Sequence, residues 1–142
     1  MAIVAAIDRS SHAHQVVEEA VSLANAFNDS IHAVHVLSRS EFVEMEGENV
    51  SETGDAIDLD RVREIAAAVA EEAIEDVNAS ADAVGLVGDA SDEIIRYADE
   101  NDARYIVVGG RKRSPVGKAI FGSVTQSILL NSRQPVVAIR IE

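Results

Sequence analysis

Residues 107–124 read Val107-Val-Gly-Gly-Arg-Lys-Arg-Ser-Pro-Val-Gly-Lys-Ala-Ile-Phe-Gly-Ser-Val124. An apolar segment runs into two glycines, a short loop with four cationic side chains follows, and a glycine–serine pair then begins a helix. Residues 103–142 hold 7 Lys/Arg and one acid, whereas residues 1–102 hold 5 Arg and 24 Asp/Glu. An acidic chain has therefore concentrated its positive charge around one glycine-flanked loop, which predicts an anion-binding site.

The length and composition predict a single α/β domain, residues 1–142. Hydrophobic residues make up 47% and aromatic residues 4%, which indicates a core of Val, Ile, Ala and Leu. The absence of cysteine excludes disulfides, thiolate catalysis and cysteine-based zinc sites. No apolar run approaches about 18 residues and no charged-then-apolar leader follows Met1, so we expect a soluble, cytoplasmic protein.

The overall charge limits the possible partners. A net charge of −13 disfavours binding to DNA or to an anionic membrane. The cations are 10 Arg against 2 Lys, and this acid-rich, lysine-poor composition is typical of a protein from a halophilic archaeon, with an acidic protein of a mesophile as the alternative. In such a cytoplasm the Debye length is about 3 Å at 1 M salt, so only charges in contact with an anion would help to bind it.

Segments typical of buried strands alternate with segments of helical periodicity. Strands are predicted at residues 2–8, 31–37, 82–87, 104–109 and 135–141. The first helix is predicted to be capped by Ser10 or Ser11, and the third by Ser91. The second and fourth helices are predicted at residues 58–80 and 122–131.

The segment 38–58 breaks this alternation. It carries seven acids with little periodicity and is predicted to be a solvated loop, with a functional lid as the alternative. The rest of the pattern, β-α-β-α-β-α-β-α-β, requires a parallel sheet with helices on both faces. Periodicity does not order the strands, but the doubly wound order 3-2-1-4-5 would bring Asp8 and Gly109 together across one crevice.

Two common nucleotide-binding motifs are absent. The phosphate loop Gly-x4-Gly-Lys-Ser/Thr fails because Gly117-Lys118 is followed by Ala119, which also removes the hydroxyl that would hold Mg²⁺. The dinucleotide fingerprint Gly-x-Gly-x-x-Gly fails because no glycine follows the first strand. What remains is Gly109, two residues, Lys112, nine residues, then Gly122-Ser123.

With this spacing the whole chain resembles a universal stress protein domain. ATP-binding members of that family carry Gly, two residues, Gly, nine residues, then Gly-Ser/Thr in this place. The resemblance includes Asp8 after the first strand, His35-Val36 in the second, Gly-Ser-Val-Thr at 122–125 and the closing Pro-Val-Val-Ala-Ile. It implies a Rossmann-like sheet of five parallel strands in the order 3-2-1-4-5, similar to the adenine nucleotide alpha hydrolase-like fold.

The resemblance also implies a ligand, which is ATP, with AMP or ADP as alternatives and Mg²⁺ as an accompanying ion. Asp8 and Val36 would contact the adenosine part, and the glycine-rich segment the ribose and phosphates. A helix N-terminus with close-approaching glycines suits phosphate physically. The nucleotide-binding residues that we predict are Ala6, Asp8, Val36, Val108, Gly109, Arg111, Lys112, Arg113, Lys118, Gly122, Ser123 and Val124.

Lys112 departs from the family pattern because it stands where ATP-binding members have the second glycine. If that glycine is needed for a positive φ, lysine would cost roughly 1–2 kcal/mol. If it is needed for close approach, the side chain would block the ligand or turn outward, and a third outcome is that its ammonium binds a phosphate. Arg111, Arg113 and Lys118 are either solvated loop charges or phosphate contacts.

The remaining polar residues do not predict catalysis. His12 and His14 are two apart on a helix and His32 and His35 three apart on a strand, so neither pair converges on a metal. We therefore expect a regulatory protein. Two alternatives stay open: a nucleotide-free stress protein that acts through protein–protein contacts, and a slow ATPase. The apolar last strand, Val136 to Ile141, predicts a homodimer through that edge.

Overall fold

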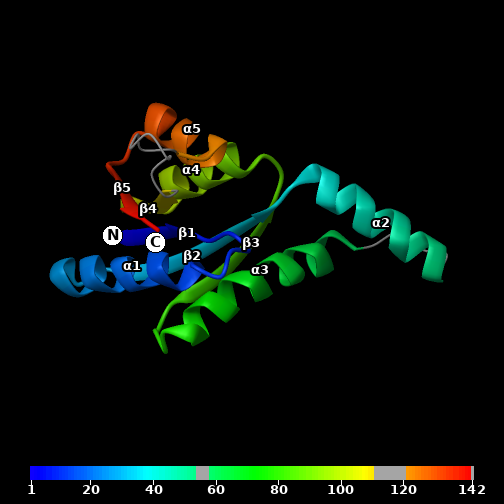
Figure 1. The fold of residues 1–142 in the computed structure, drawn as a ribbon, viewed down its shortest axis with the longest axis horizontal. Coiled ribbons are helices and arrows are strands. Elements are labelled where there is room, and N and C mark those ends of the chain that lie inside the picture. The colour runs from blue at the N-terminus through cyan, green and yellow to red at the C-terminus, as the bar shows by residue number, and fades with distance from the viewer. Residues whose placement is uncertain (54–57, 111–120, 142) are drawn as a thin grey trace.

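The computed structural model describes residues 1–53, 58–110 and 121–141, and Figure 1 shows its elements. Its five strands form one parallel sheet in the order β3-β2-β1-β4-β5, which confirms the predicted fold and strand order. The strands are β1 (Ala2–Ala6), β2 (Ser30–Leu37), β3 (Asp82–Val87), β4 (Ala103–Gly110) and β5 (Val136–Arg140). The helices are α1 (Ala13–Phe27), α2 (Arg39–Thr53), α3 (Leu59–Asp76), α4 (Ala90–Glu100) and α5 (Ser123–Asn131).

Helices cover both faces of the sheet, with α1 and α3 on one side and α4 and α5 on the other (Figure 1). Alternate residues of β1 serve the two faces, as a strand buried on both sides requires. Ile3 and Ala5 pack with α1 and α3, whereas Val4 packs with α4 and α5. Because the β1–β2 and β1–β4 pairs fill the middle of the sheet, the carboxyl ends of these three strands meet at one edge.

Gly85 sets the distance between α3 and the sheet. A Cβ at this position of β3 would lie 2.0 Å from the backbone oxygen of Arg63 and 2.5 Å from the backbone nitrogen of Ala67. These are backbone atoms of α3, so no side chain could move aside to make room. Glycine therefore lets the helix backbone lie directly against the strand.

The prediction of a loop at residues 38–58 is wrong, because most of this segment forms the helix α2. The helix begins with a reciprocal pair: Ser38 Oγ accepts from the Glu41 backbone N–H at 3.2 Å and donates to Glu41 Oε1 at 3.1 Å. Phe42 and Met45 then pack against a small cluster around Leu37. Figure 1 shows the rest of α2 leading away from the sheet.

The predicted helix caps also need correction. The α4 cap is Asp89, whose carboxylate accepts from the Asp92 N–H at 3.1 Å, while Ser91 Oγ donates to Asp89 at 3.0 Å. The α1 cap is His12, and its side chain makes no capping bond; Ser10 Oγ instead accepts from the His12 N–H at 3.3 Å. Among the helices of the described residues, none has the length and apolarity that crossing a bilayer requires.

Candidate functional site

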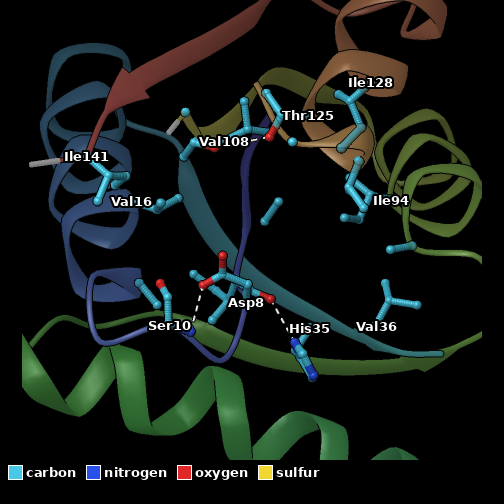
Figure 2. Close-up of a pocket in the computed structure, with 18 of the residues that line it drawn as sticks. Asp8, Ser10, Val16, His35, Val36, Ile94, Val108, Thr125, Ile128 and Ile141 are labelled. Atoms are coloured by element: carbon cyan, nitrogen blue, oxygen red, sulfur yellow. Dashed lines mark hydrogen bonds between the residues drawn. The ribbon is translucent and has the colours of Figure 1, made fainter. Parts of the chain in front are cut away.

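A cavity of about 520 Å³ opens at the carboxyl ends of β1, β2 and β4, beside the N-terminus of α5. Figure 2 looks into it, with Ile94 and Ile128 on one side and Val16 and Ile141 on the other. This edge is where the strand order reverses, the usual ligand site of a doubly wound sheet. The predicted residues that it brings together are Ala6, Asp8, Val36, Val108, Gly109, Gly122, Ser123 and Val124.

The other four predicted residues, Arg111, Lys112, Arg113 and Lys118, lie outside the described residues. Their hypothesised contacts with phosphate therefore stay predictions. The cavity also has lining residues that were not among the predicted nucleotide-binding residues. The polar ones include Ser10, His12, His35 and Thr125, and the apolar ones include Ala90, Ile94 and Ile128.

The loop after β1 forms one polar wall. The backbone N–H of Ile7 donates to the Val34 carbonyl at 2.8 Å, which holds the loop against β2. The next residue, Asp8, is exposed, and its Oδ1 accepts from the Ser10 N–H at 2.9 Å (Figure 2). This Asx-type turn fixes the carboxylate at the cavity and leaves it lone pairs for a further donor.

The N-terminus of α5 forms the opposite polar wall. Its cap, Gly122, is extended at φ −66° and ψ 162°, and no side chain in the described part of the chain caps this helix. Among the described residues no side chain accepts from the first backbone N–H groups of α5, and Ser123 adds an exposed hydroxyl beside them. Unpaired N–H groups and the partial positive charge of a helix N-terminus favour an anion here.

Thr125 ties this helix to the sheet. Its hydroxyl is buried and donates to the Gly109 carbonyl at 3.0 Å (Figure 2). Because Ser123 is two residues earlier in the helix, this bond sets where the first turn of α5 stands relative to β4. The sequence shows a threonine after Gly-Ser-Val, but the carbonyl that it binds becomes evident only in the fold.

The two glycines at the end of β4, Gly109 and Gly110, allow neighbouring atoms to pack where a Cβ would otherwise stand. A Cβ at Gly109 would lie 3.3 Å from Ile141 Cγ1 and 3.5 Å from Val16 Cγ2, and one at Gly110 would lie 3.2 Å from the Ile139 oxygen. Neither has a positive φ, since Gly88 is the only glycine of the described residues that does. Their role here is close packing of β4 against β5 and α1.

The floor of the cavity is apolar. Val36, Val108, Ile94 and Ile128 belong to one buried cluster between the sheet and the helices α4 and α5. A surface of aliphatic side chains suits a flat aromatic ring, which gains by leaving water. The cavity thus combines an apolar floor, a carboxylate on one wall and a helix N-terminus on the other.

His35 is the buried titratable group at this site. It is 6% exposed, and its Nδ1–H donates to the Ile7 carbonyl at 2.7 Å. Burial lowers the pKa of His35, so the ring is neutral, and its Nε2 has no hydrogen-bond partner among the described residues. His32 faces α4 instead, where its Nδ1 lies 2.7 Å from the Tyr97 hydroxyl.

The acidic and histidine side chains of the described residues do not form a metal-binding cluster. In the described part of the chain, no group of three or more His, Asp or Glu side chains lies close enough together to hold a metal ion. The cation nearest to Asp8 in sequence, Arg9, pairs with Glu41 of α2 at 3.4 Å.

Comparisons with known proteins agree with this architecture. The sequence model of the universal stress protein family matches residues 1–140. A universal stress protein of Mycolicibacterium smegmatis is 44% identical over 52 residues, which are 37% of this chain and 40% of that protein. The match therefore spans less than half of that relative's length.

Solved structures extend the likeness to the whole chain. A universal stress protein from Archaeoglobus fulgidus is 31% identical with a TM-score of 0.69, over 98% of this chain and 98% of that chain. A universal stress protein from the same organism, in complex with dAMP, is 24% identical with a TM-score of 0.62 over 98% and 97%. At that identity the second likeness concerns the fold alone.

Proposed function

The chain belongs to the universal stress protein family, and from that premise we propose that it binds an adenine nucleotide, ATP, in the cavity at β1, β2 and β4. In this proposal the protein is a regulatory module of the cytoplasm whose state follows the bound nucleotide. The nucleotide is the effector, and the protein does not need to transform it.

The observation that carries the proposal is that one cavity holds both kinds of contact that a nucleotide needs. Asp8 and the apolar floor at Val36 lie on the β1–β2 side, and the N-terminus of α5, which no side chain of the described residues caps, lies on the β4 side. We place the adenosine against the first and the phosphates against Ser123 and the N–H groups beside it. The volume of about 520 Å³ lies within the usual range for small-molecule sites.

The comparison with a relative supports the class of ligand. The Archaeoglobus fulgidus protein that shares this fold was solved in complex with dAMP, an adenine nucleotide. AMP, ADP and ATP share the adenosine part that would lie on the floor of the cavity. They differ in how many phosphates reach the N-terminus of α5, so their relative affinities measure the contribution of that wall.

A charge placed at the first helical position tests this arrangement. Ser123→Asp adds a carboxylate where we place the phosphates, and we expect the Kd for ATP in calorimetry to rise at least about tenfold by repulsion. An acid in the first turn favours the helix, so stability should not fall. Gln126→Glu adds the same charge to the same helix at an exposed residue that does not line the cavity, and its Kd should stay within about twofold of wild type.

The wild-type protein decides whether any nucleotide binds. Purified protein is denatured and the released small molecules are chromatographed, and ATP, ADP and AMP are titrated with and without MgCl2. No released nucleotide together with no thermal shift at millimolar ATP would leave a nucleotide-free protein that acts through protein–protein contacts. Phosphate release in the same samples separates a binding module from a slow ATPase.

We also propose that the protein is a homodimer through its last strand, Val136 to Ile141. β5 is an edge of the sheet, and an exposed edge strand needs a cover. The helix α5, which contacts β5, exposes Leu129 and, at 75%, Leu130. A monomer in sedimentation experiments at high salt would contradict this part of the proposal.

A further inference from the structure

His35 takes over a hydrogen bond at the point where two strands of the sheet separate. The last paired residues of β1 and β2 are Ala6 and Val34. Beyond them the Ile7 N–H still donates to the Val34 carbonyl at 2.8 Å, but the Ile7 carbonyl accepts from a side chain, the Nδ1–H of His35, at 2.7 Å. The imidazole therefore continues the ladder by one bond while the backbone of β1 turns into the loop.

The tautomer of His35 follows from this bond. A carbonyl oxygen can only accept, so the proton of the neutral ring lies on Nδ1. Nε2 is then a bare acceptor, buried and without a partner among the described residues. An aliphatic side chain would fill the same space without burying an unpaired nitrogen, so the bond from Nδ1 is the feature that a histidine adds here.

The bond acts on Asp8 through the peptide plane. The Ile7 carbonyl and the Asp8 N–H belong to one planar peptide group, so holding the oxygen also orients the backbone of Asp8. The carboxylate is then held from its other side by the Ser10 N–H at 2.9 Å. Figure 2 shows His35 below Asp8, with its ring directed toward α3 and away from the middle of the cavity.

We infer that His35 is a positioning residue: its Nδ1–H fixes the Ile7–Asp8 peptide and so presents the Asp8 carboxylate to the bound nucleotide. The inference rests on the proposed function, in which Asp8 contacts the adenosine part. A role in packing alone makes a different prediction, because packing depends on the volume of the side chain and not on where its nitrogen stands.

Two amide substitutions separate these roles. His35→Asn keeps an N–H donor at the δ position, whereas His35→Gln is closer to histidine in volume but carries its nitrogen at the ε position. Positioning predicts that ATP binds to His35→Asn within about threefold of wild type and to His35→Gln about tenfold more weakly, a difference that corresponds to about 1.4 kcal/mol. Packing predicts the reverse order, and that order would overturn the inference.

A second measurement is independent of nucleotide binding. The Ser10 amide hydrogen should exchange with solvent about tenfold faster in His35→Gln than in His35→Asn, since its bond to Asp8 depends on how the Asp8 backbone is held. Wild-type protein without measurable affinity for any adenine nucleotide would refute the proposed function, while the exchange rates would still decide the role of His35. Nitrogen-15 spectra that place the His35 proton on Nε2 in the wild type would overturn the inference without any variant.

Discussion

Thr125→Val removes the bond that ties α5, whose N-terminus forms one wall of the cavity, to the sheet. The Thr125 hydroxyl is buried and donates to the Gly109 carbonyl at 3.0 Å. Valine replaces the hydroxyl by a methyl group of similar size, so the shape of the side chain is kept. The Gly109 carbonyl loses this donor, and the first turn of α5 loses its link to the end of β4.

The size of the effect follows from these contacts. Leaving a buried polar group without its partner costs about 1–3 kcal/mol, so we expect the free energy of unfolding to fall by roughly 2 kcal/mol. We also expect the Kd for ATP to rise about tenfold, because the N–H groups at Ser123 would no longer be held in place. Thr125→Ser is the matched control: it keeps the hydroxyl and loses one methyl group, which costs about 1 kcal/mol of stability but should leave the Kd within about threefold.

Urea denaturation followed by circular dichroism measures the first quantity, and calorimetric titration with ATP measures the second. The two variants should change in different ways, since valine affects stability and affinity together and serine affects stability alone. Wild-type affinity in Thr125→Val, or a weaker affinity in Thr125→Ser than in Thr125→Val, would refute the role given to this bond.

Three further predictions concern the scaffold and use urea midpoints as the readout. Gly85→Ala should lower the free energy of unfolding by about 3 kcal/mol or more, because its Cβ would lie 2.0 Å from a backbone atom of α3. Gly47→Ala is the control and should not lower it, because a Cβ at Gly47 would have no atom within 4 Å. Equal urea midpoints for the two variants would contradict this prediction. Asp89→Ala should cost about 1 kcal/mol through loss of the α4 cap, and no change would mean that water replaces it. Because burial lowers the pKa of His35, the imidazole is protonated at a higher pH in the unfolded chain than in the folded protein. The free energy of unfolding should therefore be constant above about pH 6.5 and fall as the pH drops from there toward the pKa of the folded state. His35→Asn should flatten this dependence of stability on pH, and an unchanged dependence would assign it to other titratable groups.

The strands and their parallel sheet were predictable because local chemistry decides them, whereas the order of the strands was implied by the resemblance to the family. The apolar runs within residues 2–8, 31–37 and 104–109 place buried side chains on both faces of the sheet, and their alternation with helices leaves few ways to build a parallel sheet. The cavity follows from the same argument, since the carboxyl ends of β1 and β4 must be neighbours in this order. This is why eight predicted residues line one cavity.

The helix α2 was missed although part of its signal is in the sequence. Ser38 and Glu41 have the spacing of a capping box, and the structure shows the first of its hydrogen bonds, from the Glu41 N–H to Ser38 Oγ, while the Glu41 carboxylate accepts from the Ser38 hydroxyl. The apolar stripe is short, however, because it rests on Phe42 and Met45. With so few buried contacts and a run of glutamates, periodicity could not separate this helix from a solvated loop.

Two contacts of the site could not be predicted from the sequence at all. The bond from Thr125 to Gly109 joins residues 16 positions apart, and that from His35 to Ile7 joins residues 28 positions apart. In both bonds the acceptor is a backbone carbonyl: the Thr125 hydroxyl donates to that of Gly109, and the His35 imidazole donates to that of Ile7. Every residue has the same backbone carbonyl, so the sequence does not show which carbonyls lack a backbone donor in the folded protein.

The pairing of β1 with β4 has a consequence for the order of events in folding. It joins residues about 100 positions apart, such as Val4 and Ile106, and a contact of such long range closes late and slowly. The two polar walls of the cavity lie on opposite sides of this pairing. A chain emerging from the ribosome therefore cannot hold a ligand with both walls until almost all of it has been synthesised, and a ligand present at that time would bind the finished domain and shift the equilibrium toward it.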